Sequence, residues 1–88
     1  MARVVIYLTG SCGYCHAAER MLERKGIRDI ERIRVDLDPA RRAEMRARSG
    51  RTSVPQIWID GRHVGGYDEL YELAHEGGLE PLLEPERT

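Results

Sequence analysis

The sequence has few cysteines, no long apolar run and no strong excess of charge of one sign. Its two cysteines and three scattered histidines do not supply a structural zinc site, which needs about four ligands. No apolar run approaches the roughly 20 residues of a membrane-spanning helix or the roughly 7–15 residues of a secretory h-region. The formal net charge of -1 implies no general affinity for nucleic acid or acidic lipid. We therefore expect one small cytoplasmic domain over residues 1–88, with no membrane and no nucleic-acid partner.

The two cysteines stand together in Cys12-Gly13-Tyr14-Cys15, where a strand is expected to give way to a helix. Residues 3–8 are a β-branched apolar run of strand length, and apolar residues recur at helical spacing from Ala17 to Leu22. Positions i and i+3 of a helix share one face, with Cβ atoms about 5–6 Å apart, so the pair can form and break a disulfide with little movement. So small a loop gains little stability from a disulfide. The pair is better explained by redox chemistry.

The helix start makes the two thiols unequal. Cys12 lies at the helix N-terminus, where free N–H groups and the positive end of the dipole favour an anion. Cys15 lies one turn further on, on the same face as the apolar residues, where burial keeps it a thiol. We therefore expect Cys12 to attack and Cys15 to resolve.

A second strand and a second helix are predicted in the middle of the chain. Ile33, Val35 and Leu37 alternate with polar residues, as in a strand with one buried face, and they complete a right-handed βαβ unit. Asp38 followed by proline starts a helix, which Gly50 ends. This helix is rich in arginine, and most of its arginines are expected to lie on a solvated face. The alternative is that one or two near residue 51 face the cysteines and attract an anionic substrate.

A hairpin and a further helix are predicted in the last third of the chain. Residues 54–59 are strongly β-prone, and Asp60-Gly61 is the signal for a type I′ turn into a strand at residues 62–64. Proline is permitted at the start of a strand. Asp68 begins a helix whose free N–H groups can hold a carboxylate. Residues 79–83 form a short apolar anchor before a polar tail, residues 84–88.

The predicted order β-α-β-α-β-β-α, with Cys-x-x-Cys after the first strand and Val54-Pro55 before the third, resembles the thioredoxin fold. This is an α/β fold with a central four-stranded mixed sheet flanked by helices. Cys12-Gly13-Tyr14-Cys15, residues 52–57 and residues 65–70 are similar to the active-site, TVP and GG-x-D segments of small bacterial dithiol glutaredoxins. The similarity spans nearly the whole chain.

The resemblance implies a glutathione-dependent thiol–disulfide oxidoreductase that reduces protein disulfides and glutathione mixed disulfides. Its catalytic residues are Cys12 and Cys15, and glutathione is the reductant, regenerated indirectly by glutathione reductase. The family's cis-proline corresponds to Pro55 and exposes the Val54 backbone to glutathione, while Asp68 faces the γ-glutamyl amine. The implied glutathione-binding residues are Tyr14, Ser53, Val54, Pro55, Gly66, Tyr67 and Asp68.

Two positions depart from the family pattern. Gly13 replaces the usual proline between the cysteines, and Thr9 stands where a lysine is common, so an arginine is expected to substitute for that lysine. The tryptophan-containing C-terminal motif of donors served by thioredoxin reductase is absent, which favours glutathione. Gly13 also leaves open a two-iron two-sulfur cluster, held between two protomers by Cys12 of each and two glutathiones. Without a cluster, the resemblance implies a monomer.

Other interpretations of single motifs remain open at this point. Cys12-x-x-Cys15-His16 fits the c-type haem attachment pattern, but haem attachment requires export, and His16 is more simply an exposed helical residue. A non-catalytic binding module has no need of both cysteines. Tyr14 and Tyr67 are as readily structural as functional on pattern alone, and Trp58 is expected in the core or on the strand surface.

Overall fold

Strands and helices alternate along the chain as the sequence predicts. The computed structural model describes residues 2–83, so the predicted polar tail lies outside the described residues. The elements are β1 (Val4–Leu8), α1 (Gly13–Arg24), β2 (Ile30–Arg34), α2 (Pro39–Ser49), β3 (Gln56–Ile59), β4 (Arg62–Gly65), α3 (Tyr67–His75) and α4 (Leu79–Leu83). The short apolar anchor predicted after the last long helix is thus the helix α4. No helix within residues 2–83 has the length and apolar character needed to cross a membrane.

The four strands form one mixed sheet in the order β2-β1-β3-β4. β1 pairs with β2 in parallel, with Val4 opposite Ile30, and it pairs with β3 in the antiparallel sense. β3 and β4 are the antiparallel arms of the predicted hairpin. Asp60 and Gly61 have φ values of 50° and 82°, as the two central residues of a type I′ turn require.

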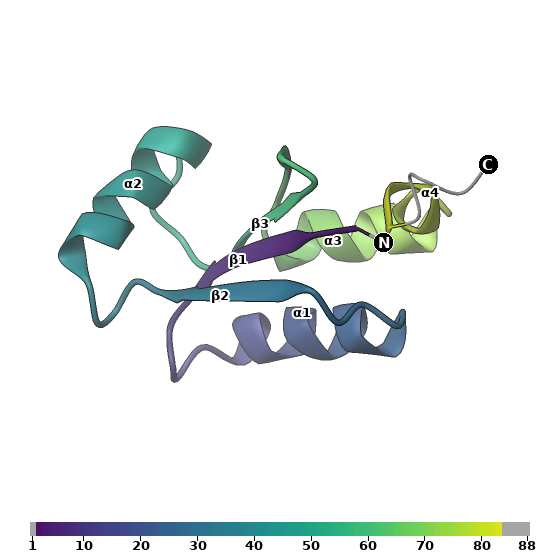
Figure 1. Cartoon of the computed structure of the whole chain (residues 1–88), viewed down its shortest axis with the longest axis horizontal. Coiled ribbons are helices and arrows are strands. Elements are labelled where there is room, and N and C mark those ends of the chain that lie inside the picture. Colours follow the sequence, from purple (N-terminus) through teal and green to yellow (C-terminus); the bar gives the residue numbers. More distant parts are fainter. Residues whose placement is uncertain (1, 84–88) are drawn as a thin grey trace.

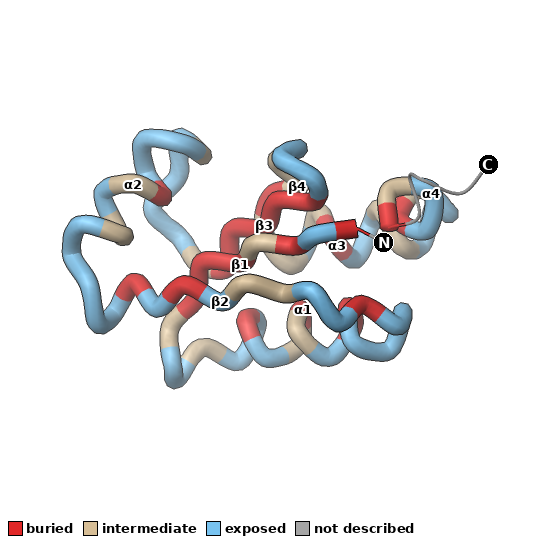
Figure 2. Tube along the Cα trace, in the orientation of Figure 1, coloured by how far each residue is buried: buried red, intermediate tan, exposed pale blue. Residues whose placement is uncertain are grey.

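The helices cover both faces of this sheet (Figure 1). Alternate residues of a strand point to opposite faces, so Ile6 and Ile57 pack on one side with Leu22 of α1 and Leu70 of α3. On the other side, a smaller cluster contains Tyr7, Ile33, Val35, Met45 and Trp58, with Met45 supplied by α2. Figure 2 shows the buried residues concentrated along the central strands β1 and β3. The predicted thioredoxin fold is therefore confirmed.

The second strand is predicted too late in the chain. β2 ends at Arg34, and the Val35 N–H still donates to the Leu8 carbonyl over 3.0 Å, but Leu37 is 70% exposed. The reason is that β1 ends at Leu8, so the chain after Val35 has no strand beside it. The Asp36 carboxylate instead accepts from the Gly10 N–H.

The helix α2 begins and ends where the sequence signals place it. The Asp38 carboxylate accepts a hydrogen bond from the Ala40 N–H over 3.0 Å at the start of α2, and Gly50 ends α2 with φ at 73°. α1 and α3 lie side by side with their N-terminal ends toward the same end of the molecule (Figure 1). Free N–H groups at both helix starts are thereby brought to the same end of the sheet.

Candidate active site

Cys12 is the residue that begins α1. Its backbone is extended, with φ -91° and ψ 113°, and its side chain takes the place of a capping side chain by accepting from the Cys15 N–H over 3.1 Å. The Cys12 sulfur also lies 3.9 Å from the Val54 carbonyl oxygen, where its S–H donates. The sulfur is therefore fixed between the first turn of α1 and the segment that precedes β3.

Cys15 is fully buried, with its side chain in the core formed by α1 and the sheet. Burial, followed by the hydrogen bond with Cys12, raises the pKa of the Cys15 thiol to about 12, because a buried site disfavours the charged form. Both cysteines are free thiols in the structure, and Cys12 is the more exposed of the two. This is the inequality that the helix start predicts.

A shallow groove of about 250 Å³ lies beside the cysteines. It brings together residues from α1, from the segment before β3 and from the start of α3. Its lining residues are Tyr14, Arg51, Ser53, Val54, Pro55, Gly66, Tyr67, Asp68 and Glu69. All seven residues that the family resemblance implies for glutathione binding are among them. The Val54–Pro55 peptide bond in this lining is cis.

The two glycines before α3 let that helix approach the groove floor. A Cβ atom on residue 66 would lie 3.2 Å from the Pro55 carbonyl oxygen, so a side chain there would push the two segments apart. Gly65 has φ at 119°, in the range that L residues rarely adopt. The pair therefore places the free N–H groups of α3 against the segment that carries Val54.

Arg51 and Glu69 also line the groove, and Glu69 is not among the glutathione-binding residues that the sequence predicts. The Glu69 carboxylate accepts from the Gly66 N–H over 2.7 Å and from the Arg51 guanidinium over 3.0 Å. These two donors, the Gly66 N–H first, hold the pKa of the Glu69 carboxyl below its ordinary value. Glu69 is the third residue of α3, a position from which a glutamate can reach back to the N–H of the residue before the helix. The usual sequence signature has Ser or Thr at that preceding position, and Gly66 stands there instead, so the sequence carries only half of the signal.

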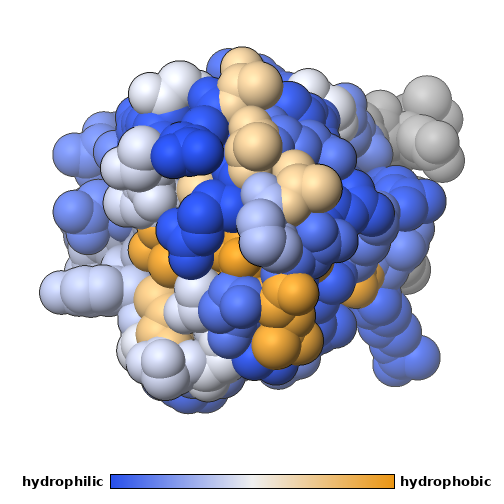
Figure 3. Space-filling view, turned by 90° about the vertical axis from the view of Figure 1, so that its left-hand side faces the viewer, coloured by the Kyte–Doolittle hydropathy of each residue, from blue (hydrophilic) through white to orange (hydrophobic). Residues whose placement is uncertain are grey.

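Tyr14 and Tyr67 form an aromatic edge to the groove. Their ring centroids lie 5.8 Å apart with the planes tilted by 32°. Tyr14 is 66% exposed. A ring stabilises the fold in proportion to the apolar area that it buries, so packing alone does not explain an aromatic residue at this position. Figure 3 views the end of the molecule toward which α1 and α3 begin, and its surface is mostly hydrophilic with small hydrophobic patches.

His16 is an exposed helical residue, as expected from the sequence. Both of its ring nitrogens have protein partners, since Nε2 lies 3.1 Å from the Gly10 carbonyl oxygen and Nδ1 lies 3.2 Å from a Glu19 carboxylate oxygen. These contacts account for His16 within the loop and first turns of α1. Trp58 is buried in the sheet, against α2, as predicted.

The fold and the cysteine pair define a class of protein. A Cys-x-x-Cys motif at the first turn of a helix, beside a mixed sheet of this topology, is the arrangement of a thioredoxin-fold thiol–disulfide oxidoreductase.

Comparison with known proteins identifies the family within that class. The sequence profile of the glutaredoxin family matches residues 4–64. The chain is 51% identical to Glutaredoxin 3 of Escherichia coli strain K12, over 94% of this chain and 99% of that protein. It is 48% identical to a glutaredoxin of Neisseria meningitidis, over 97% of this chain and 100% of that protein. The chain therefore belongs to the glutaredoxin family and is a glutathione-dependent oxidoreductase with a Cys12–Cys15 pair.

Solved structures give the same result. The solution structure of glutaredoxin from Brucella melitensis superposes with a TM-score of 0.85 at 44% identity, covering 100% of this chain and 95% of that one. The crystal structure of a buckwheat glutaredoxin–glutathione complex superposes with a TM-score of 0.88 at 29% identity, covering 96% of this chain and 78% of that one. The predicted family is thereby confirmed.

Proposed function

We propose that this glutaredoxin reduces both protein disulfides and glutathione mixed disulfides through the Cys12-Gly13-Tyr14-Cys15 motif. One observation carries the proposal: the partly exposed Cys12 sulfur lies between a backbone N–H donor and the Val54 segment, at the edge of the groove. Cys15 is buried behind it. An exposed sulfur held by a donor suits the attacking role, and a buried thiol suits the resolving role.

With a glutathionylated protein, one thiolate is enough. The Cys12 thiolate attacks the glutathione sulfur of the mixed disulfide, and the substrate protein leaves as its thiolate. Cys12 is then joined to glutathione by a disulfide. A second glutathione, as thiolate, attacks the glutathione sulfur of that disulfide, which releases oxidised glutathione and restores the Cys12 thiolate.

With a protein disulfide, both cysteines take part. Cys12 attacks one substrate sulfur and the other leaves as a thiolate, which can take up the Cys15 proton. The Cys15 thiolate then attacks the Cys12 sulfur and releases the reduced substrate. The resulting Cys12–Cys15 disulfide is reduced by two glutathione molecules, which become oxidised glutathione. Cys15 has to lose its proton only at this stage, which agrees with its raised pKa.

The groove is the proposed glutathione site. The Val54 backbone pairs with the glutathione backbone, Asp68 faces the γ-glutamyl amine, and the N–H groups at the start of α3 face its carboxylate. Ser53, Pro55, Gly66 and the rings of Tyr14 and Tyr67 complete the lining. The solved complex of the buckwheat glutaredoxin with glutathione supports this assignment.

Arg51 is the arginine that we propose in place of the lysine missing at Thr9. It lines the groove, and its guanidinium pairs only with the half-exposed Glu69 side chain among the ion pairs of residues 2–83. An exposed ion pair of this kind contributes little, about 0–1 kcal/mol. The Arg51 guanidinium can therefore turn from Glu69 to the glycine carboxylate of glutathione at little cost.

The cellular setting follows from the reductant. Glutathione reductase regenerates glutathione in the cytoplasm, where we place this chain as a single domain over residues 1–88 that acts as a monomer. Its protein partners are disulfide-containing or glutathionylated proteins, which meet it at the exposed Cys12.

A second binding function is proposed on the surface around Gly13. Apart from its two chain neighbours and the first turns of α1, a Cβ atom on this residue would have no protein atom within 4 Å, so the surface at Gly13 is open. Residues 2–83 contain no group of three or more side chains able to hold a metal ion. A two-iron two-sulfur cluster would therefore need Cys12 from each of two protomers and two glutathione thiolates.

Replacement of Asp68 tests the proposed glutathione site. Asp68→Ala should slow reduction of glutathionylated cysteine more than reduction of hydroxyethyl disulfide, because only the first substrate has a γ-glutamyl group. The rate measured is that of the initial reaction of the reduced protein with each substrate, without added glutathione. Glu72→Ala is the matched control, since Glu72 lies on the same helix one turn further on and outside the groove lining. Equal losses on both substrates would mean that Asp68 only stabilises the start of its helix.

A further inference from the structure

Apart from the Tyr7 hydroxyl and the Cys15 thiol, the Gln56 amide is the only polar side-chain group on a fully buried residue among residues 2–83. Gln56 is the first residue of β3 and directly follows Pro55. A buried amide without hydrogen-bond partners costs free energy. The hydrogen bonds of Gln56 therefore fix the positions of the groups that serve as its partners. Gln56 is not part of the groove lining.

The hydrogen bonds of Gln56 connect the groove to the edge strand of the sheet. Its amide nitrogen lies 3.1 Å from the Ser53 carbonyl oxygen and 3.4 Å from the Ser53 hydroxyl. Its amide oxygen lies 2.9 Å from Nε2 of His63 on β4. A carbonyl can only accept, so the amide nitrogen must face Ser53 and the amide oxygen must face His63. His63 therefore carries its hydrogen on Nε2 and donates it to Gln56.

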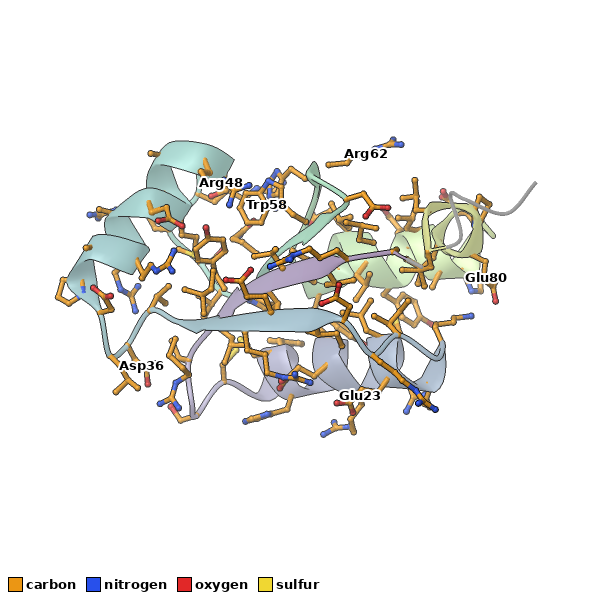
Figure 4. All side chains as sticks on the ribbon, viewed as in Figure 1. Glu23, Asp36, Arg48, Trp58, Arg62 and Glu80 are labelled. Atoms are coloured by element: carbon orange, nitrogen blue, oxygen red, sulfur yellow. The ribbon has the colours of Figure 1, made fainter. Side chains whose placement is uncertain are left out.

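His63 is itself held in place by the core cluster beneath α2. Its ring lies 4.6 Å from the Trp58 ring, centroid to centroid. The Arg48 guanidinium of α2 lies 4.4 Å from the centroid of the same Trp58 ring, and Figure 4 shows Arg48 beside Trp58. Packing against Trp58, outside the groove, thus fixes the direction in which the His63 Nε2–H points toward Gln56.

The Ser53 carbonyl shares one peptide plane with the Val54 N–H. The peptide unit is rigid and planar, and in a trans unit the C=O and N–H point in opposite directions. The only cis peptide bond in the described chain is the next one, Val54–Pro55. A donor that holds the Ser53 carbonyl from inside the protein therefore directs the Val54 N–H away from the interior.

We propose that Gln56 and His63 are positioning residues for glutathione: they orient the Ser53–Val54 peptide so that the Val54 backbone is presented to the substrate. This inference rests on the proposed function, because it requires glutathione to pair with Val54. Neither residue lines the groove, so both are proposed to act through the Ser53–Val54 peptide.

The sharpest test is Gln56→Glu, which preserves the shape of the side chain. An ionised glutamate has no donor, so it still accepts from His63 but can no longer donate to the Ser53 carbonyl. Because burial favours the neutral acid, whose O–H could replace one amide N–H, the KM of this variant is measured from pH 6 to pH 9 and should rise relative to the unchanged protein as the carboxyl ionises. His63→Phe is the second variant, because it keeps a ring against Trp58 and removes the donor to Gln56. His63→Gln restores an N–H donor at that position. Ile59→Val is the matched control for lost packing, since Ile59 is buried in the same strand and lies in the cluster on the α1 side.

The measurements separate positioning from folding and from thiol chemistry. With glutathionylated cysteine as substrate, Gln56→Glu and His63→Phe should raise the KM about tenfold and fivefold, as loss of a buried hydrogen bond predicts. His63→Gln should return the KM toward that of the unchanged protein. Ile59→Val should leave the KM within about twofold, and all variants should keep the rate of Cys12 alkylation by iodoacetamide within about twofold.

Each outcome decides one question. An unchanged KM in both Gln56→Glu and His63→Phe would overturn the inference, as would an equal rise in Ile59→Val. If Gln56→Glu does not fold, His63→Phe and its rescue by His63→Gln decide alone. The Asp68→Ala comparison is independent: if it is selective for the glutathione substrate while the Gln56 and His63 variants have no effect, only the positioning role is lost.

Discussion

The amide nitrogen of Cys15 donates its hydrogen to the sulfur of Cys12 over 3.1 Å. One residue thus serves two purposes, since its backbone holds the attacking sulfur and its side chain supplies the resolving thiol. A hydrogen bond to a thiolate is charge-assisted and stronger than one to a neutral sulfur. Because the donor belongs to the backbone, it survives replacement of the Cys15 side chain.

The division of labour can be tested by replacing each cysteine with serine. Cys12→Ser should abolish reduction of both glutathionylated substrates and protein disulfides. Cys15→Ser should keep reduction of glutathionylated substrates, because the Cys12 sulfur retains its N–H donor, and should lose most reduction of an insulin disulfide. If Cys15→Ser is as inactive as Cys12→Ser toward a glutathione mixed disulfide, the assigned roles are wrong.

The raised pKa of Cys15 predicts how the two thiols respond to pH. With a pKa of about 12, folded Cys15 remains a thiol near neutral pH, whereas an unperturbed cysteine ionises near 8.5. Mass spectrometry after brief treatment with iodoacetamide near pH 7 should find Cys12 modified and Cys15 intact. In the folded protein, iodoacetamide should modify Cys15 only when the pH rises far above 8.5.

The same shift has a consequence for stability. The folded state binds the Cys15 proton more tightly than the unfolded chain does. The stabilisation of the folded state by the protonated thiol is therefore complete below about pH 8.5 and is lost as the pH rises toward 12. The free energy of unfolding should therefore fall between pH 8 and pH 10 more steeply in the unchanged protein than in Cys15→Ala. Parallel pH profiles would show that Cys15 ionises at its ordinary pKa when folded.

The sequence predicts the groove well because its residues come from three short motifs whose spacing fixes their place in the fold. Cys12 and Cys15 follow β1, Val54 precedes β3, and Asp68 lies in the first turn of α3, so the topology alone brings them to one end of the sheet. Local signals are also sufficient where they are strong, as with the Asp38 cap and the Asp60-Gly61 turn.

The residues that the sequence leaves out are those defined by contacts distant along the chain. β2 is predicted too late because its end depends on where β1 stops. The alternation of apolar and polar residues that continues to Leu37 carries no information about the end of β1. Gln56 reads as one member of a β-prone run, and only the packed structure shows that it is a buried polar residue. The pairing of Arg51 with Glu69 spans 18 positions, so no local pattern contains it.

Arg51 offers a test of how glutathione is held without the usual lysine. Arg51→Met should raise the KM for glutathionylated cysteine about fivefold to tenfold, as expected for loss of a charged hydrogen bond, with a smaller effect on kcat. Arg62→Met is the matched control, because Arg62 is an exposed arginine of β4 outside the groove lining (Figure 4). The same rise in both variants would show that only the overall charge matters.

Tyr7 tests the core cluster beneath α2 separately from the redox site. Its ring is fully buried, and its hydroxyl donates to the Glu44 carboxylate and accepts from the Arg48 guanidinium. Tyr7→Phe should lower the free energy of unfolding by about 0.5–1.5 kcal/mol, the net value of a typical hydrogen bond, because Glu44 is only half-buried and Arg48 is exposed, so water can replace the lost hydroxyl. Urea unfolding of the reduced protein measures this value.

Tyr71→Phe is the control for Tyr7, because Tyr71 is 52% exposed and a surface substitution changes stability by less than about 0.5 kcal/mol. Both variants should reduce glutathionylated cysteine at the rate of the unchanged protein. Equal stability of the two variants would mean that the Tyr7 hydroxyl contributes no net stability.

Replacement of Gly13, the residue after Cys12, tests whether the protein binds a cluster in addition to its redox activity. Proline fits the first position of a helix, and the position of Gly13 is open, so Gly13→Pro should fold normally while its ring fills the space beside the Cys12 sulfur. Anaerobic incubation of the unchanged protein with iron, sulfide and glutathione should give a brown dimer with visible absorbance. That absorbance should vanish in Cys12→Ser and fall sharply in Gly13→Pro, because thiolates are the ligands that such clusters use. A colourless monomer from the unchanged protein would remove cluster binding and leave the oxidoreductase activity unaffected.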